Sequence, residues 1–155
     1  MRKAFTMIEL IFVIVVIGVL AAIAIPRISA TRDDAALAKS MIDIAVAIQD
    51  INAYYVSQGK LALDTTNKTV KFREMTNAGT IDNSGALGFL IKDDECLVFA
   101  KNYDKETNLR VKVSEQGLCK RLWETPEFKK FRETIKPAQG ATPAYIEFGA
   151  SRVAF

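Results

Sequence analysis

The chain has 155 residues, a formal net charge of +3, two cysteines and no histidine. The missing histidine removes the commonest general base and transition-metal ligand, so Ser–His, Cys–His and most zinc-dependent chemistries are excluded. We therefore expect no enzymatic activity, no cofactor and no metal, and the nearly balanced charge argues against a globally basic protein.

The most distinctive segment is residues 5–26, FTMIELIFVIVVIGVLAAIAIP, which follows the basic leader MRKA at residues 1–4. At about 1.5 Å per residue, a helix of this length crosses the roughly 30 Å hydrocarbon core of a bilayer. Arg2 and Lys3 precede it and no acid does, so the positive-inside rule places the rest of the chain outside the cytoplasm. An ordinary secretory signal is the alternative, but its apolar run is usually shorter and has no use for Glu9.

Residues 3–10, KAFTMIEL, together with the apolar run and Pro26, resemble the class III signal and N-terminal helix of type IV pilins and pseudopilins. The resemblance covers only this N-terminal region, and Ala4 stands where the family usually has Gly. It implies that a membrane-embedded prepilin peptidase cleaves between Ala4 and Phe5, and that Phe5 is then N-methylated. It also implies an inner-membrane assembly platform and partners of the same family, which pack through their N-terminal helices.

Glu9 is an acid inside the apolar segment, where a lone charge is expensive. Cleavage before Phe5 would create an ammonium group, and an ion pair with Glu9 would relieve the desolvation cost of both groups. Pairing between subunits would fix axial register in an assembly. Because Phe5 and Glu9 are four residues apart, the pair can equally form within one helix, and a Glu9 that reaches the membrane interface is a third interpretation.

Gly18 and Pro26 bracket small and β-branched residues, and Pro26 removes a backbone donor from the helix. We expect local weakening here. The resemblance implies a loss of helical order on assembly, and a plain kink is the alternative.

Residues 27–58 continue the helix as an amphipathic segment that ends near Gly59. Its apolar residues recur at intervals of three and four, which predicts a stripe made of Ala38, Met41, Ile42, Ala45, Ile48, Ile51 and Tyr55. The stripe needs a partner, and residues 59–155 are long enough to form a small globular head. The predicted fold class is thus α+β: a long helix, membrane-spanning in its first half, packed on a small antiparallel sheet, as in pilins.

Within the head, apolar and polar alternation predicts strands at residues 69–73, 96–100, 109–113 and 144–149. Turn-forming residues 102–108 join the second and third of these in an antiparallel hairpin. Residues 126–135 are predicted to form a short helix that is N-capped by Thr125 and stopped by Pro137.

Cys96 and Cys119 flank the hairpin, and we expect a disulfide in an oxidising periplasm. A redox pair lacks the C-x-x-C spacing, and two thiols without histidine make a poor metal site.

Two oxygen-rich clusters, residues 93–95 and 80–85, are the only calcium candidates, and solvated loops are the commoner explanation because neither has EF-hand spacing.

Basic residues crowd the hairpin and the short helix. They permit nucleic-acid binding, but we favour a solvated or subunit-facing surface. This basic surface is Lys101, Lys105, Arg110, Lys112, Lys120, Arg121, Lys129, Lys130 and Arg132.

Two functions of different class follow. The first is a structural pilin or pseudopilin subunit, processed in the inner membrane and assembled into a periplasmic or cell-surface filament that serves type II secretion or DNA uptake. The second is a non-filamentous, membrane-anchored periplasmic module that binds DNA or a protein through its basic surface.

Overall fold

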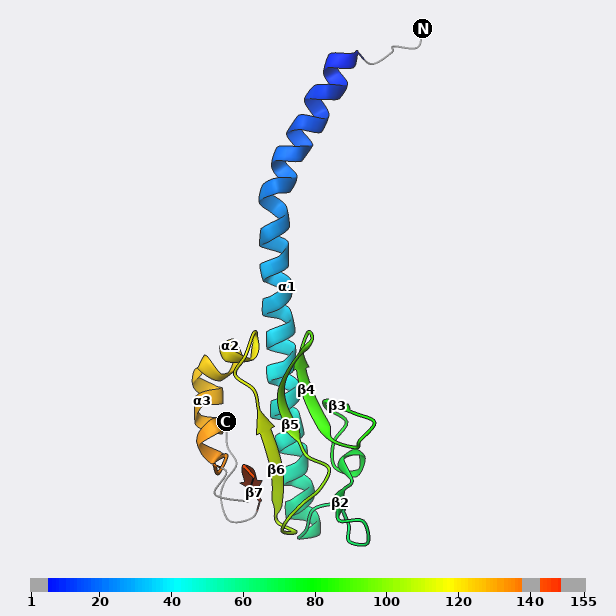
Figure 1. Ribbon diagram of the computed structural model, residues 1–155, viewed down its shortest axis with the longest axis vertical. Coiled ribbons are helices and arrows are strands. Elements are labelled where there is room, and N and C mark those ends of the chain that lie inside the picture. The colour runs from blue at the N-terminus through cyan, green and yellow to red at the C-terminus, as the bar shows by residue number, and fades with distance from the viewer. Residues whose placement is uncertain (1–5, 138–142, 149–155) are drawn as a thin grey trace. The chain divides into compact units, whose positions relative to one another are not determined.

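The structure is a computed structural model that describes residues 6–137 and 143–148 (Figure 1). The chain divides into two units, Met1–Ala35 and Ala36–Phe155, and helix α1 (Met7–Gln58) begins in the first unit and ends in the second. Ala4 and Phe5, where we predict processing, lie outside the described residues.

In the first unit, residues 7–35 are helical without a break, so the backbone is continuous at positions 18 and 26. The side chains at positions 25–27, 29 and 30 lie outside the described part of the structure, and Pro26 is among them. A loss of helical order on assembly therefore stays a prediction.

In the second unit, residues 36–58 of α1 contribute Ile44, Ala47, Ile48 and Ile51 to the apolar core, and each is at most 1% exposed. The helix ends as predicted: Gly59 has a φ of 69°, and its N–H donates to the Tyr55 carbonyl. The predicted stripe was wrong at two positions, because Ala38 and Ile42 are exposed. Ala and Ile occur on more than one face of this helix, so periodicity alone did not identify the buried face.

The head is built on a five-stranded antiparallel sheet in the order β3-β4-β5-β6-β7. Its strands are β3 (Thr80–Ile81), β4 (Leu87–Ile91), β5 (Asp94–Phe99), β6 (Asn108–Val113) and β7 (Tyr145–Glu147). A separate two-stranded sheet joins β1 (Leu63–Asp64) to β2 (Thr69–Val70). The predicted hairpin is confirmed, since Val98 of β5 pairs with Lys112 of β6, and the predicted C-terminal strand is confirmed as β7.

The sheet buries Leu87, Phe89, Leu97 and Phe99 in the same core as the inner face of α1, which runs alongside β4, β5 and β6 (Figure 1). Alternation along β4 and β5 sends Leu90 and Val98 to the opposite, outer face. The predicted strand at residues 69–73 was partly wrong, because only Thr69 and Val70 form a strand. The chain then forms the 3-10 helix η1 (Phe72–Glu74), and the Phe72 side chain is buried in the core.

Two short helices follow β6: α2 (Cys119–Glu124) and α3 (Pro126–Thr134). The predicted helix is α3, with Pro126 in its first turn and Phe128 and Phe131 buried. Thr125 occupies the N-cap position but does not cap with its side chain, because its hydroxyl donates to the Leu122 carbonyl instead. Helix α2 was not predicted. The ring of its Trp123 stacks nearly parallel to the ring of Phe131 on α3, with 6.4 Å between the ring centroids.

Candidate functional site

The N-terminal end of α1 is closed by reciprocal hydrogen bonds between Thr6 and Glu9. The Thr6 backbone N–H and the Thr6 hydroxyl each donate to Glu9 Oε2 at 2.8 Å. In return, the Glu9 N–H donates to Thr6 Oγ1 at 3.3 Å. This is a capping box, with Thr6 as N-cap and Glu9 as the third helical residue.

The capping box holds the Glu9 carboxylate at the positive end of the helix, where backbone N–H groups and the helix dipole favour an anion. The carboxylate is also exposed, so a partner from outside the helix can reach it. Both Thr6 bonds use one carboxylate oxygen, Oε2. Thr6 was missed from the sequence, although its T-x-x-E spacing to Glu9 is the capping-box signature.

Residues Met7–Ala24 form a helix that is long and apolar enough to cross a membrane, with a mean hydropathy of 3.0 and none of the span buried. Within it, Gly18 meets no atom of the described structure within 4 Å of an added Cβ. An unburied apolar helix of this length needs lipid or other protein around it. Glu9 therefore lies near one end of a surface made for an apolar environment.

Residues 1–25 match the family model described as the prokaryotic N-terminal methylation motif. This segment is a prepilin signal. The prepilin signal supports a type IV pilin-like or pseudopilin precursor, and it implies processing by a prepilin peptidase and assembly with other pilin subunits. Together with the apolar helix, it fits membrane anchoring. No curated protein and no solved structure matches the chain.

The head beyond the prepilin signal is braced around a disulfide between Cys96 and Cys119, as predicted. Both residues are fully buried, and the bond joins β5 to the start of α2. Asp94 strengthens the same connection, because its carboxylate accepts the Leu118 N–H at 2.8 Å. Trp123 Nε1–H donates to the Ser114 carbonyl at 2.8 Å. Sequence reasoning missed the roles of Asp94 and Trp123, which only the long-range packing reveals.

Several members of the predicted basic surface are paired with acids. Arg110 binds the Asp104 carboxylate through two nitrogens, and these hydrogen bonds hold the pKa of Asp104 below its ordinary value and raise that of Arg110. Arg132 lies 2.5 Å from a carboxylate oxygen of Glu115 and 5.6 Å from the centre of the Trp123 ring. These pairs reduce the positive charge that the basic surface offers to an anionic partner.

Two lysines of the same surface make contacts of different kinds. Lys120 pairs with Glu124 on α2 at 3.9 Å, and the stem of Lys101 packs beside Gly85. Lys105, Lys112, Arg121, Lys129 and Lys130 complete the predicted set. At least three of the nine members, Arg110, Arg132 and Lys120, thus form ion pairs with acids.

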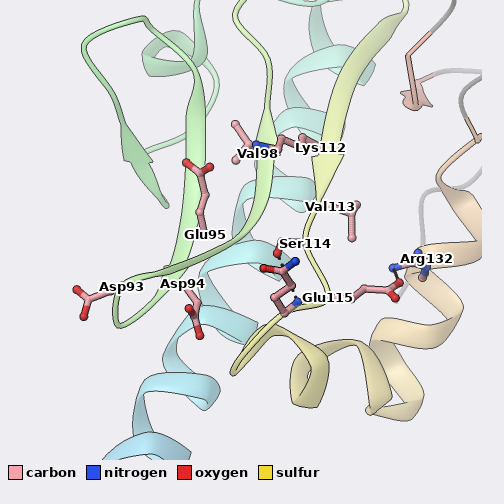
Figure 2. Close-up of a pocket in the computed structure, with 10 residues that line it drawn as sticks. Asp93, Asp94, Glu95, Val98, Lys112, Val113, Ser114, Glu115 and Arg132 are labelled. Carbon is pink, nitrogen blue, oxygen red and sulfur yellow. Dashed lines mark hydrogen bonds and ion pairs between the residues drawn. The ribbon is translucent and has the colours of Figure 1, made fainter.

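An open hollow of about 720 Å³ lies between the β4–β5 turn, the end of β6 and α3 (Figure 2). Its lining includes the first calcium candidate, Asp93 to Glu95, but Asp93 and Glu95 point away from each other (Figure 2). Asp94 is bonded to Leu118. Among the described residues no group of three carboxylate, thiol or imidazole side chains is arranged to hold a metal ion.

The second calcium candidate is a tight turn. The Asp82 carboxylate accepts the Ser84 hydroxyl at 2.6 Å and the Ala86 N–H at 2.9 Å, and these bonds lower its pKa. Gly85 supplies the positive φ of 89° that the turn requires. One oxygen of this carboxylate, Oδ1, thus accepts hydrogen bonds from the hydroxyl and the backbone of its own turn.

Proposed function

We propose that this chain is a structural subunit of a type IV pilus-like filament, processed after Ala4 and assembled through its N-terminal helix, and that it has no enzymatic role. The observation that carries the proposal is the methylation motif at residues 1–25 on a helix that presents an unburied apolar surface and a single acid near its start. A polar contact inside apolar packing is a strong determinant of register, because an unpaired charge is costly there.

In this proposal, the Glu9 carboxylate pairs with the ammonium group of Phe5 from a neighbouring subunit. The Thr6 bonds occupy Oε2, so Oε1 is the oxygen that we assign to the ammonium group. The helix would stand in the inner membrane with the head in the periplasm, before extraction into a periplasmic or cell-surface filament. The inner-membrane assembly platform would carry out that extraction.

The proposed filament serves type II secretion or DNA uptake. The two machines are separated by deleting the gene from its native host and measuring secreted protein and transformation frequency in parallel. Loss of one activity and retention of the other identifies the machine.

The assembly role is tested by Glu9→Gln, which keeps the shape of the side chain and removes its charge. The expected result is a processed, membrane-inserted protein that forms no filaments by electron microscopy of sheared cells. The matched control is Glu95→Gln, an exposed acid of the head, which should leave filaments intact. Normal filaments from Glu9→Gln would overturn the assembly role.

A further inference from the structure

The outer face of α1 in the second unit carries a heptad-like row of uncharged residues. Successive members are four and three residues apart, which is the a and d spacing of a coiled coil. We call this row the seam: Ala38, Ile42, Ala45, Gln49, Asn52 and Val56.

The seam lies opposite the face that packs in the head. Ile42 is 62% exposed and Val56 is 77% exposed, whereas Ile44 and Ile51 on the inner face are fully buried. At 3.6 residues per turn, the two rows fall on opposite sides of the helix. The head therefore covers Ile44 and Ile51 but leaves two large aliphatic side chains of the seam, Ile42 and Val56, uncovered.

Lipid is a poor candidate to cover the seam. The same turns of α1 carry Lys39 and Asp43, an ion pair at 3.7 Å in which the Lys39 side chain is 82% exposed. Asp50 lies on these turns too and accepts the Thr76 hydroxyl at 2.8 Å. Such charges place this part of the helix in water, so an apolar cover has to come from protein.

We infer that the seam is covered by the seam of a second copy of this chain, in a parallel, in-register pair that forms in the membrane before any filament. The inference rests on the proposed membrane insertion of Met7–Ala24. Two copies inserted in one bilayer emerge on the same side and at the same height, so identical residues of their α1 helices face each other. Such a contact is isologous, and each residue meets its own counterpart across a two-fold axis.

The chemistry of the seam fits this arrangement. Ala38 and Ala45 are small, and they let two helix backbones approach closely beside the Ile42 layer. Gln49 and Asn52 supply amides that bond to their counterparts only when the helices are in register, as a single polar layer does in coiled coils. The seam is short, so the pair is weak in solution. Confinement of both copies to one membrane raises their effective concentration and compensates for this weakness.

The test uses the full chain with Ile42→Cys, expressed in membranes of a host that has no filament machinery and treated with a mild oxidant. The native Cys96 and Cys119 are buried and bonded to each other, so they do not compete. We expect a 42–42 cross-linked dimer at a yield at least about tenfold above that of Leu90→Cys. Leu90 is a matched control, because it is 44% exposed but lies on the outer face of the sheet.

A charge exchange provides the second measurement. Ile42→Lys and Ile42→Glu should each abolish co-purification of two differently tagged copies, because like charges would meet in register. Coexpression of the two variants should restore it. An unchanged unfolding midpoint is expected for both variants, since Ile42 does not contribute to the core.

Other outcomes overturn the inference in distinguishable ways. Membrane-inserted protein that gives no 42–42 dimer overturns the pair and leaves the proposed function standing. Cross-linking only between Ile42→Cys copies and Val13→Cys copies has the same consequence, because it shows a partner helix that is staggered along the axis. Protein that is recovered entirely outside the membrane contradicts both the pair and the proposed function. Retained co-purification of each charged variant alone also rules out the pair.

Discussion

Removing the disulfide by Cys96→Ala together with Cys119→Ala should destabilise the head without changing its fold. The two cysteines are 23 residues apart in the chain. Chain-entropy theory assigns about 3 kcal/mol to a cross-link that closes a loop of this size. For a domain of about 100 residues, that loss lowers the unfolding midpoint by about 14 °C.

Trp123 makes the measurement local. It is the only tryptophan in the chain, it is 5% exposed, and it lies on α2, the helix that the disulfide joins to β5. Thermal unfolding of the detergent-solubilised full chain is followed by Trp123 fluorescence. The native chain unfolded in reductant is the control, because it loses the same cross-link. If the unfolding midpoint of the variant lies within about 2 °C of that of the oxidised native chain, the stabilisation that we attribute to the disulfide is refuted.

Three further predictions concern other contacts. Cross-linked multimers larger than a pair should fall at least about tenfold in Glu9→Gln in the native host, because an unpaired ammonium group would remain in apolar packing, and equal yields would contradict this. The Arg110–Asp104 pair should stabilise the head at pH values above 3.8, the ordinary pKa of Asp104, and this stabilisation should disappear as the pH falls through the lower pKa that Asp104 has in the folded state. The unfolding midpoints of the native chain and Asp104→Asn should therefore differ at neutral pH and become equal at acid pH. A difference that does not change with pH would disprove this prediction. Gly117→Ala should destabilise by about 1–3 kcal/mol, because Gly117 has a φ of 56° and an added Cβ would overlap the Asp94 carboxylate; urea unfolding should show little change for Gly88→Ala, whose nearest contact is an ordinary 3.6 Å.

The parts of the molecule that could be predicted from sequence are those whose signals are local. The apolar composition of residues 5–26 predicts a membrane span, and the alternation of apolar and polar residues at 109–113 predicts a strand. The short helix begins at Pro126, which has its φ already set for a first turn. Cys96 and Cys119 are the two cysteines of the chain, so a disulfide in an oxidising compartment could form only between them.

The parts that were missed depend on contacts far apart in the chain. Strand β4 has Gly88 as its second residue and apolar residues on both faces, so its sequence shows neither alternation nor a helical period. Helix α2 has no side-chain N-cap at Leu118 and is only six residues long. Its position follows from the disulfide and from Asp94. The inner face of α1 was also decided by the sheet, because Ile42 and Ile44 are equally apolar and only Ile44 of these two packs in the core of the head.

The most direct test of the account is the identity of the first residue of the mature protein. Mass spectrometry of the protein extracted from membranes of its native host should find Phe5 at the N-terminus, carrying an added methyl group. That result would place an ammonium group four residues before Glu9 and make the proposed pairing available. An intact Met1, or an N-terminus at Ile25 or Thr31, would contradict the account, because Glu9 would then lack its partner or be removed with a secretory signal.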